Sequence, residues 1–426
     1  MKNYILISLL FILTVFSCRK DFEENQITEN PHVPVFIDNY HPAVENVTSS
    51  VFGVVVDEDG QAVEGAEISL GSLTQMTNVF GTFSFDNIEM NKKGTFVQVE
   101  KAGYFLSGRR FYPTEGNKNK IKIELLQKNF SESFESGVGG TVAISDNGGT
   151  IVFQPNSIRT EAGDSYNGTV HVATKYLDPT ALVTFDQMPG ALQGVNSSNE
   201  EGGLSTYGMI GVELQGDAGE QLNIADNQTA KITMNLPASL QGAAPAEIPL
   251  WSFNYTYGIW VEDGKALLQD GKYVGEVSHF SFWNCDLFSE VVGFGVAVVD
   301  NNQEPIEGAG VKISLANGLS SGFGYTGTNG YVGGILPANE ELLLEVISPC
   351  GDILYTQTIG PFMAGISIGT IEIEVANVIE ITGTILNCDG GEVNNGIVII
   401  KQGGVFNSYI VDTNPFSIRI VACSNI

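Results

Sequence analysis

Short runs of alternating apolar and polar residues dominate this chain and limit what it can fold into. Thr82–Phe85 and Ile121–Leu125 alternate strictly, and turns rich in glycine and acids separate such runs. A period of two places every second side chain on one face, as in a half-buried β-strand. The 50 glycines follow no collagen period, so they fit turns, where glycine reaches positive φ at little cost. Sustained helical periodicity is absent after residue 17, and we predict an all-β chain of many short strands.

Acidity excludes one class of partner. The chain has 49 acidic and 20 basic residues, which give a formal net charge of −29. Nucleic-acid binding needs basic patches that displace counterions from phosphates, and we recognise none in the sequence. We therefore expect no nucleic-acid partner. The 426 residues suffice for three or four domains.

Residues 1–17 have the pattern of a signal peptide. Lys2 supplies a positive start, and Ile5–Phe16 is apolar at all but two positions. This run is shorter than the about 20 residues that cross a bilayer, so it is not a transmembrane helix. Val15–Cys18 resembles a bacterial lipobox, although Phe16 is bulkier than usual there. The resemblance implies cleavage before Cys18 and lipid attachment to its thiol; the alternative is an ordinary secretory signal with a chance cysteine.

The residues after Cys18 indicate a destination. Arg19–Glu24 places two basic residues and then acids beside the lipid, which resembles the surface-export signal of Bacteroidetes-type lipoproteins; the alternative is a solvated acidic tether. We expect a lipid-anchored protein of the outer membrane, exposed at the cell surface, with membrane lipid as a partner through Cys18. Residues 18–47 contain prolines and asparagines without alternation, so they predict a flexible stalk.

Residues 48–127 form the first predicted domain. A strand at Val51–Val56 leads into a turn at Asp57–Gly60, and later strands include Phe96–Tyr104 with its Gly-Tyr exit and Ile121–Leu125. This succession resembles the carboxypeptidase regulatory-like domain, a small transthyretin-like (prealbumin-like) β-sandwich. The resemblance implies an accessory module rather than a zinc peptidase, and the chain contains no His-Glu-x-x-His motif.

The sequence pattern of the first domain recurs twice later in the chain. Val296–Ala309 matches the opening of the first domain, which predicts a second sandwich over 289–376, and Ile381–Gly390 opens a third copy over 377–426. Self-similarity on this scale indicates an array of like modules. We align Phe416–Cys423 with Leu342–Cys350 of the second copy, and the sequence then ends before a counterpart of the strand at Ile368–Ile373. We therefore expect the third repeat to be incomplete, either because the sequence is truncated at its C-terminus or because the last module is short.

Residues 128–288 differ from these modules and predict a larger β-rich domain. Tryptophan motifs at Pro249–Phe253 and Gly258–Gly264 precede the ending His279–Asp286. The succession resembles the β-rich region of astroprincin-like and cartilage intermediate layer proteins. This resemblance implies an extracellular, non-catalytic domain beside transthyretin-like modules. The predicted architecture is therefore tandem β-sandwiches flanking a larger β-rich domain.

Two patterns mimic catalytic or nucleotide-binding motifs. His279 and Ser281 would lie on one face of a strand with Asp286 nearby, as in a triad, but their aromatic neighbours favour a structural polar network. Gly318–Gly322 fits Gly-x-Ser-x-Gly, yet no helix follows it as a nucleophile elbow requires. Gly322–Gly327 mimics a dinucleotide fingerprint without its βαβ setting. We expect no enzyme activity and no cofactor.

Two further groups are candidate ligand sites. Asp57–Asp59 clusters oxygens that calcium favours, but without the EF-hand pattern a solvated turn is the better interpretation, and we expect no metal. The three tryptophans could stack on sugars, but aliphatic and aromatic neighbours favour a core position for Trp251, Trp260 and Trp283.

Four cysteines remain if Cys18 carries lipid. An exported compartment permits disulfides, and four cysteines allow three pairings. We favour Cys388 with Cys423, because both lie in the third copy; Cys285 and Cys350 then remain as buried thiols or as a second pair.

These observations lead to one functional hypothesis and two alternatives. We expect a non-enzymatic cell-surface lipoprotein whose sandwich modules serve ligand binding, adhesion or scaffolding, with a protein or glycan ligand that the sequence does not name. The first alternative is a glycan-binding accessory lipoprotein for outer-membrane nutrient uptake. The second is an unrecognised hydrolase.

Overall fold

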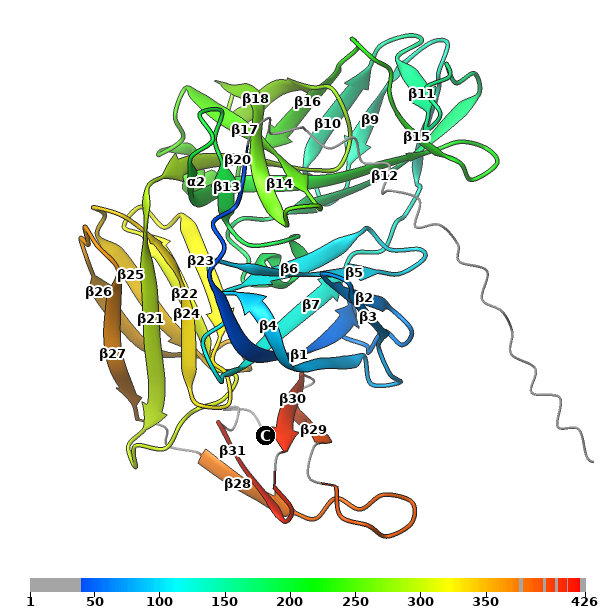
Figure 1. Ribbon diagram of the computed structural model, residues 1–426. Coiled ribbons are helices and arrows are strands. Elements are labelled where there is room, and N and C mark those ends of the chain that lie inside the picture. The colour runs from blue at the N-terminus through cyan, green and yellow to red at the C-terminus, as the bar shows by residue number, and fades with distance from the viewer. Residues whose placement is uncertain (1–39, 375–377, 394–395, 403–404, 412, 422–426) are drawn as a thin grey trace, which may run out of the picture. The chain divides into compact units, whose positions relative to one another are not determined.

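The computed structural model describes residues 40–374, 378–393, 396–402, 405–411 and 413–421. The described chain is almost entirely β, which confirms the predicted fold class (Figure 1). Its helices are two single turns, α1 (Thr184–Gln187) and α2 (Ala238–Gln241), each of four residues. Within the described ranges, neither helix approaches the length that would cross a bilayer.

The first β-sandwich has a three-stranded and a four-stranded sheet. In the first sheet, β1 runs antiparallel to β4 and parallel to β7. Alternation places Ile121 and Ile123 of β7 in the sandwich core and turns the neighbouring Lys120 and Lys122 to the other face. The strands are, in sheet order, β4 (Thr82–Asn91), β1 (Asn46–Asp57) and β7 (Lys118–Leu125), then β3 (Leu73–Met76), β2 (Glu67–Leu70), β5 (Thr95–Glu100) and β6 (Ser107–Phe111).

The second β-sandwich repeats this topology strand for strand. Its β21 again runs antiparallel to β24 and parallel to β27. The predicted internal repeat is therefore present as one topology built twice. The strands are β24 (Tyr331–Pro337), β21 (Val291–Asp300) and β27 (Ile366–Ile373), then β23 (Ser320–Tyr325), β22 (Gly310–Leu315), β25 (Leu342–Ile347) and β26 (Ile353–Ile359).

The third segment contains two described pairs of strands. β28 (Val378–Gly383) pairs antiparallel with β31 (Phe416–Val421), and β29 (Gly396–Gln402) pairs antiparallel with β30 (Val405–Val411). These pairings match β1 with β4 and β2 with β3, so β31 corresponds to β4 and β24. The expected alignment of β31 with Leu342–Cys350, which includes β25, is wrong, because an alternating strand carries no mark of its place in a sheet.

One turn recurs in all three repeats. Oδ1 of Asp57 accepts the backbone amides two and four positions later at 3.0 and 2.8 Å, and Oδ1 of Asp300 does so at 2.8 and 3.0 Å. Asn387 repeats the contacts at 3.0 and 2.7 Å. Asp and Asn favour such turns because their short side chains reach the following amides. The turn allows the chain to leave the first strand and begin the second sheet.

A buried threonine fixes the next part of both complete sandwiches. Thr77 Oγ1 donates to the carbonyl of Val63 at 2.6 Å and accepts the amide of Ala66 at 2.8 Å. Thr326 makes the equivalent contacts in the second sandwich at 2.6 and 2.9 Å. The repeats therefore share side-chain hydrogen bonds as well as strand order.

The central domain is built on one sheet of 13 strands. Its two buried clusters contain the three tryptophans, each 0% exposed. Trp251 Nε1 donates to the carbonyl of Asp286 at 3.1 Å. The core interpretation of the tryptophans is confirmed, and they form no exposed sugar platform. The strands are β8 (Glu132–Glu135), β9 (Gly140–Ile144), β10 (Gly149–Phe153), β11 (Ile158–Thr160), β12 (Thr169–Leu177), β13 (Gln193–Val195), β14 (Glu201–Gln215), β15 (Gln221–Ile224), β16 (Ala230–Asn235), β17 (Glu247–Asn254), β18 (Ile259–Gln269), β19 (Lys272–Val277) and β20 (Phe282–Ser289).

Candidate binding cleft

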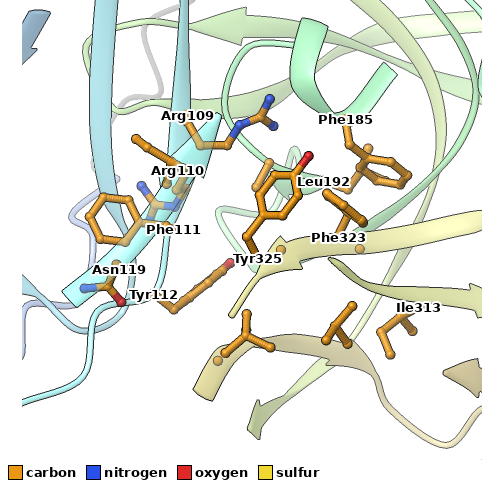
Figure 2. Close-up of a pocket in the computed structure, with 18 of the residues that line it drawn as sticks. Arg109, Arg110, Phe111, Tyr112, Asn119, Phe185, Leu192, Ile313, Phe323 and Tyr325 are labelled. Atoms are coloured by element: carbon orange, nitrogen blue, oxygen red, sulfur yellow. The ribbon is translucent and has the colours of Figure 1, made fainter. Parts of the chain in front are cut away.

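A basic cleft lies where the first sandwich, the central domain and the second sandwich meet (Figure 2). Its inner cavity has a volume of about 100 Å³ and is lined by β6, β7, α1 and β23, among other segments. An outer part of about 940 Å³ adjoins it. The two parts are neighbours with a common wall, because both are lined by Tyr112, Phe294, Tyr331, Gly333, Gly334 and Ile335.

The basic character of the cleft comes from one stretch of sequence. Nine of the 20 basic residues lie between residues 92 and 128. On β7, Lys118, Lys120 and Lys122 alternate with the core residues, so all three project from the face away from the sandwich core. The cleft was not predicted from the sequence, although the alternating lysines of β7 could have indicated it. The expectation that the chain has no nucleic-acid partner stays a prediction.

A buried carboxylate joins three parts of the chain inside the cleft. Asp186 of α1 accepts hydrogen bonds from Lys122 Nζ at 2.9 Å and from the Tyr325 hydroxyl at 3.1 Å. Burial favours the neutral amine of Lys122, but the charge of Asp186 and their hydrogen bond outweigh it and raise the pKa of Lys122. Burial, reinforced by Asp186, raises the pKa of the Tyr325 hydroxyl well above its ordinary value. The three side chains come from β7, α1 and β23 and form one junction.

Arg109 lines the inner cavity beside this junction. Its Nη1 donates to the carbonyl of Gly190 at 3.1 Å, whereas its Nη2 is buried and has no hydrogen-bond partner among the described residues. Figure 2 shows the Arg109 guanidinium near the hydroxyl of Tyr325. Burial lowers the pKa of Arg109, and the charge of Asp186 opposes that shift. A stacked pair, Phe185 and Phe323, with ring centroids 5.3 Å apart, forms an apolar wall of the cavity.

A polar network closes the floor of the outer cleft. Gln193 Oε1 accepts hydrogen bonds from Arg110 Nε at 2.7 Å and from the Tyr112 hydroxyl at 2.6 Å, and Gln193 Nε2 donates to Glu201 at 3.0 Å. The Tyr40 hydroxyl donates to the other oxygen of Glu201 at 2.7 Å. Burial raises the pKa of Tyr112 to about 12. These groups satisfy one another and hold the cleft in shape.

Lys120 connects the first sandwich to the third segment. Its Nζ donates to the carbonyl of Ser408 at 2.5 Å and lies 4.4 Å from the ring centroid of Tyr409, both on β30. Burial lowers the pKa of Lys120, and the charge of Glu307 opposes that effect. The ammonium is therefore held by a carbonyl and an aromatic face, which is a favourable setting for a buried cation.

The three residues that could have suggested a triad do not lie in one catalytic arrangement. His279 Nε2 lies 3.1 Å from Asp263, and the Ser281 hydroxyl donates to the backbone carbonyl of Phe282 at 3.1 Å. Asp286 is 0% exposed and accepts a hydrogen bond from Asn284 Nδ2 at 2.5 Å. The side chains belong to separate structural contacts, as the polar-network interpretation expects.

The Gly-x-Ser-x-Gly match and the overlapping dinucleotide-like match lie in a strand hairpin. Gly318 has a φ of +87° in the turn, and β23 begins at Ser320. A strand, not a helix, follows the serine, so the nucleophile-elbow geometry is absent there. Gly322 and Gly324 lie within the same strand, so that pattern also has no helix N-terminus for a phosphate.

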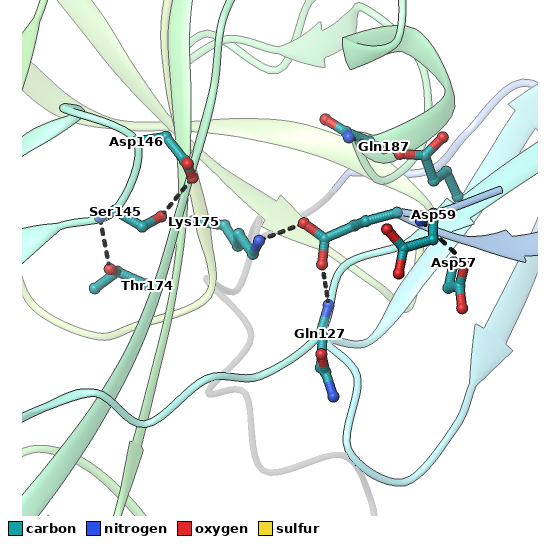
Figure 3. Close-up of polar contacts among 10 residues, drawn as sticks. Asp57, Asp59, Gln127, Ser145, Asp146, Thr174, Lys175 and Gln187 are labelled. Atoms are coloured by element: carbon teal, nitrogen blue, oxygen red, sulfur yellow. Dashed lines mark hydrogen bonds and ion pairs between the residues drawn. The ribbon is translucent and has the colours of Figure 1, made fainter. Parts of the chain in front are cut away.

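Carboxylates of the acidic turn at Asp57–Asp59 are bonded to other groups of the protein. Asp57 accepts a hydrogen bond from the backbone amide of Gln61 in the same turn. The Glu58 carboxylate forms an ion pair with Lys175 of β12 and accepts a hydrogen bond from the backbone amide of Gln127 (Figure 3). In the described ranges, no group of three or more metal-ligating side chains gathers here or elsewhere. The solvated-turn interpretation must therefore be refined, because the turn also contacts the central domain.

The cysteines differ from the expected pairing. Cys388 is a free, exposed thiol, so its expected disulfide with Cys423 is not formed. Cys423 and the predicted lipidation site Cys18 lie outside the described residues. Cys285 is free and buried, whereas Cys350 is disulfide-bonded. Membership of one repeat was thus a poor guide to pairing, since a disulfide requires Cα atoms within about 7 Å.

Fold and cleft together define a multi-module all-β protein whose sandwiches meet around a basic cleft. No family model matches the chain. It is similar to cartilage intermediate layer protein 2 of Mus musculus, with 24% identity over 222 residues, 50% of this chain and 19% of that protein. It is also similar to cartilage intermediate layer protein 1 of Sus scrofa, with 30% identity over 120 residues, 27% of this chain and 19% of the relative. The predicted resemblance to these proteins is confirmed over half the chain.

Two solved structures illustrate the distant similarity of the fold. A putative membrane-associated protein of unknown function from Bacteroides fragilis has 10% identity and a TM-score of 0.18, and covers 58% of this chain and 99% of its own. The major pilin subunit BcpA of Bacillus cereus has 9% identity and a TM-score of 0.17, and covers 78% of this chain and 99% of its own. These matches carry no argument about function.

Proposed function

We propose that this protein is a non-enzymatic lipoprotein of the cell surface that presents rigidly joined β-modules for ligand binding or scaffolding. The observation that carries the proposal is the buried junction at Asp186, where Lys122 and Tyr325 of the two sandwiches meet the central domain. A junction of this kind restrains the modules and keeps the cleft open between them. Binding surfaces gain affinity from such preorganisation, because less freedom is lost when the ligand binds.

Anchoring through Cys18 is the first part of this proposal. The disulfide of Cys350 supports it, because disulfides persist in exported compartments and are rare in the cytosol. Radiolabelled palmitate should enter the full-length protein and should not enter Cys18→Ser. Protease added to intact cells should remove the β-modules of the anchored protein. Label in the Cys18→Ser variant, or a protein found free in the cytosol, would reject the anchor.

Binding without turnover is the second part. Tagged full-length protein should capture a partner from native neighbouring cells and should show no activity on peptides, esters or glycosides. The variant Ser281→Ala tests the hydrolase alternative directly. Any turnover that this substitution abolishes, with folding intact, would overturn the non-enzymatic proposal.

Glycan binding for nutrient uptake is the second candidate function. The outer cleft favours it, because Tyr40, Tyr112 and Tyr331 line a space of about 940 Å³, and aromatic rings can pack against sugars. The buried tryptophans play no part in it. A glycan array should give a signal that Tyr112→Ala and Tyr331→Ala reduce, while a blank array with capture of a protein partner would favour scaffolding.

A further inference from the structure

The charges that line the inner cavity are opposite to those of the molecule as a whole. Four of its lining residues are basic, Arg109, Arg110, Lys120 and Lys122, and one, Asp186, is acidic. The whole chain carries 49 acids against 20 basic residues. A basic cavity in so acidic a protein attracts anions locally, because low-dielectric walls strengthen the field inside a cleft.

All four cations have at least one acceptor, and Arg109 Nη1 donates to the Gly190 carbonyl. Arg110 donates to Gln193, Lys120 to the Ser408 carbonyl and Lys122 to Asp186. Arg109 differs in its second terminal nitrogen, because Nη2 is buried without a hydrogen-bond partner in the described part of the chain. A buried charged donor without an acceptor is costly, so the protein gains stability from any group that supplies one.

We propose that the inner cavity is an oxyanion site in which Arg109 Nη2 binds a carboxylate or sulfate group of a ligand. This inference rests on the proposed binding function and names the chemistry of its ligand. A planar guanidinium suits oxyanions because it offers parallel N–H donors to two oxygens. The stacked rings of Phe185 and Phe323 keep one wall of the cavity dry, which strengthens that contact.

The dimensions of the cleft decide which part of the ligand enters. The inner cavity of about 100 Å³ corresponds to roughly three water molecules, so a carboxylate or sulfate group fits and a whole sugar ring does not. The outer part of about 940 Å³ accommodates the remainder of the ligand. We expect the anionic group to enter from the side of the outer cleft, which shares part of its lining with the inner cavity.

Calorimetric titration of the full-length protein at constant ionic strength tests the site. Sulfate and glucuronate should bind, whereas glucose, which has the same ring without a carboxylate, should bind about tenfold more weakly or not at all. The substitution Arg109→Gln should lower the binding affinity for sulfate and for glucuronate by about tenfold or more. Arg159→Gln is the matched control, because Arg159 pairs with the exposed Asp226 in the central domain. The Arg159→Gln variant should bind sulfate and glucuronate with the same affinities as the unmodified protein.

A second measurement covers the case in which Arg109→Gln does not fold. The variant Arg109→Lys keeps the charge but lacks the forked guanidinium donors, and thermal unfolding reports its binding. Sodium glucuronate should raise the Tm of the unmodified protein more than that of Arg109→Lys, whereas glucose with an equal concentration of sodium chloride should raise neither. Absence of sulfate binding, unchanged affinity in Arg109→Gln, or an equal rise of Tm in Arg109→Lys would each overturn the oxyanion site. A protein that still carries lipid and captures a partner would then retain the proposed function without this ligand chemistry.

Discussion

Individual buried residues carry the polar chemistry of the central domain. Asp286 shows this best: it is 0% exposed, lies beside Cys285 and accepts a hydrogen bond from Asn284. Burial raises the pKa of Asp286 well above its ordinary value, and a hydrogen bond with Thr206 opposes the shift only in part. At a pH between the unfolded-state and folded-state pKa values, the folded protein therefore keeps a proton there that the unfolded chain releases.

This pKa gives a prediction with a definite sign. Because the folded-state pKa of Asp286 is the higher one, its contribution to stability is present below the unfolded-state pKa and is lost as pH rises through the folded-state pKa. Asp286→Asn should remove that dependence and raise the free energy of unfolding at pH 7. Urea unfolding followed by tryptophan fluorescence between pH 4 and pH 8 measures it. Asp226→Asn, at an exposed position, is the control, and a loss of stability in Asp286→Asn at pH 7 would contradict the prediction.

The cysteines should differ in reactivity. Cys388 is exposed and free, so iodoacetamide should modify it in the native protein without reductant. Cys285 should react only after unfolding, because it is buried and burial raises its thiol pKa. Cys350 should react only after reduction. Mass mapping of the alkylated peptides checks all three, and rapid native labelling of Cys350 would refute its disulfide.

At the scale of single elements, the three repeats share hydrogen bonds at positions where their sequences differ. The turn after the first strand keeps its side-chain hydrogen bonds in Asp57, Asp300 and Asn387, although the residues between the contacts differ. The strand predicted at Ile121–Leu125 is present and lies within β7. The identity of β31 was not predictable in the same way, because its place depends on pairing with β28 and not on its own pattern.

The shared turn gives an element-scale prediction. Asp57→Ala removes the acceptor of two backbone amides and should cost about 1–2 kcal/mol of unfolding free energy. Amide hydrogen exchange at Gln61 should accelerate with it. Asp59→Ala, in the same exposed turn, should leave both quantities near those of the unmodified protein. Equal effects of the two substitutions would show that charge, and not the turn contact, matters at this position.

At the scale of the whole molecule, the contacts between modules were beyond sequence reasoning. Arg109, Asp186 and Tyr325 lie far apart in the chain and meet only because three domains converge. The charge pattern of β7 was visible, but its partners were not. The lipid anchor and the domain boundaries, by contrast, stay predictions from the sequence.

An ion pair between modules supplies the prediction at this scale. Arg419 of β31 pairs with Asp300 of the second sandwich at 2.5 Å, and Asp300 is fully buried. Burial alone would raise the pKa of Asp300, but the amides of its turn and the charge of Arg419 outweigh it and lower that pKa. The stabilisation is thus present above the unfolded-state pKa and is lost as pH falls through the lower folded-state pKa.

Arg419→Gln should therefore loosen the third segment. Loss of the partner of a largely buried carboxylate should cost about 1–3 kcal/mol, after allowance for the partial exposure of Arg419. Amides of β28 and β31 should exchange faster, while those of β1 and β4 should not change. Arg159→Gln should alter neither set, and unchanged exchange in β31 of Arg419→Gln would contradict the role of the ion pair.

The contact of Tyr40 with Glu201 has a mechanical consequence. Tyr40 lies six residues before β1, is 6% exposed, and packs edge-on against Tyr257 with ring centroids 5.3 Å apart. Tension that arrives from the N-terminal side therefore reaches the thirteen-stranded sheet before it reaches the first sandwich. The contacts of Tyr40 must therefore break before that tension acts on β1, the first strand of the small sandwich.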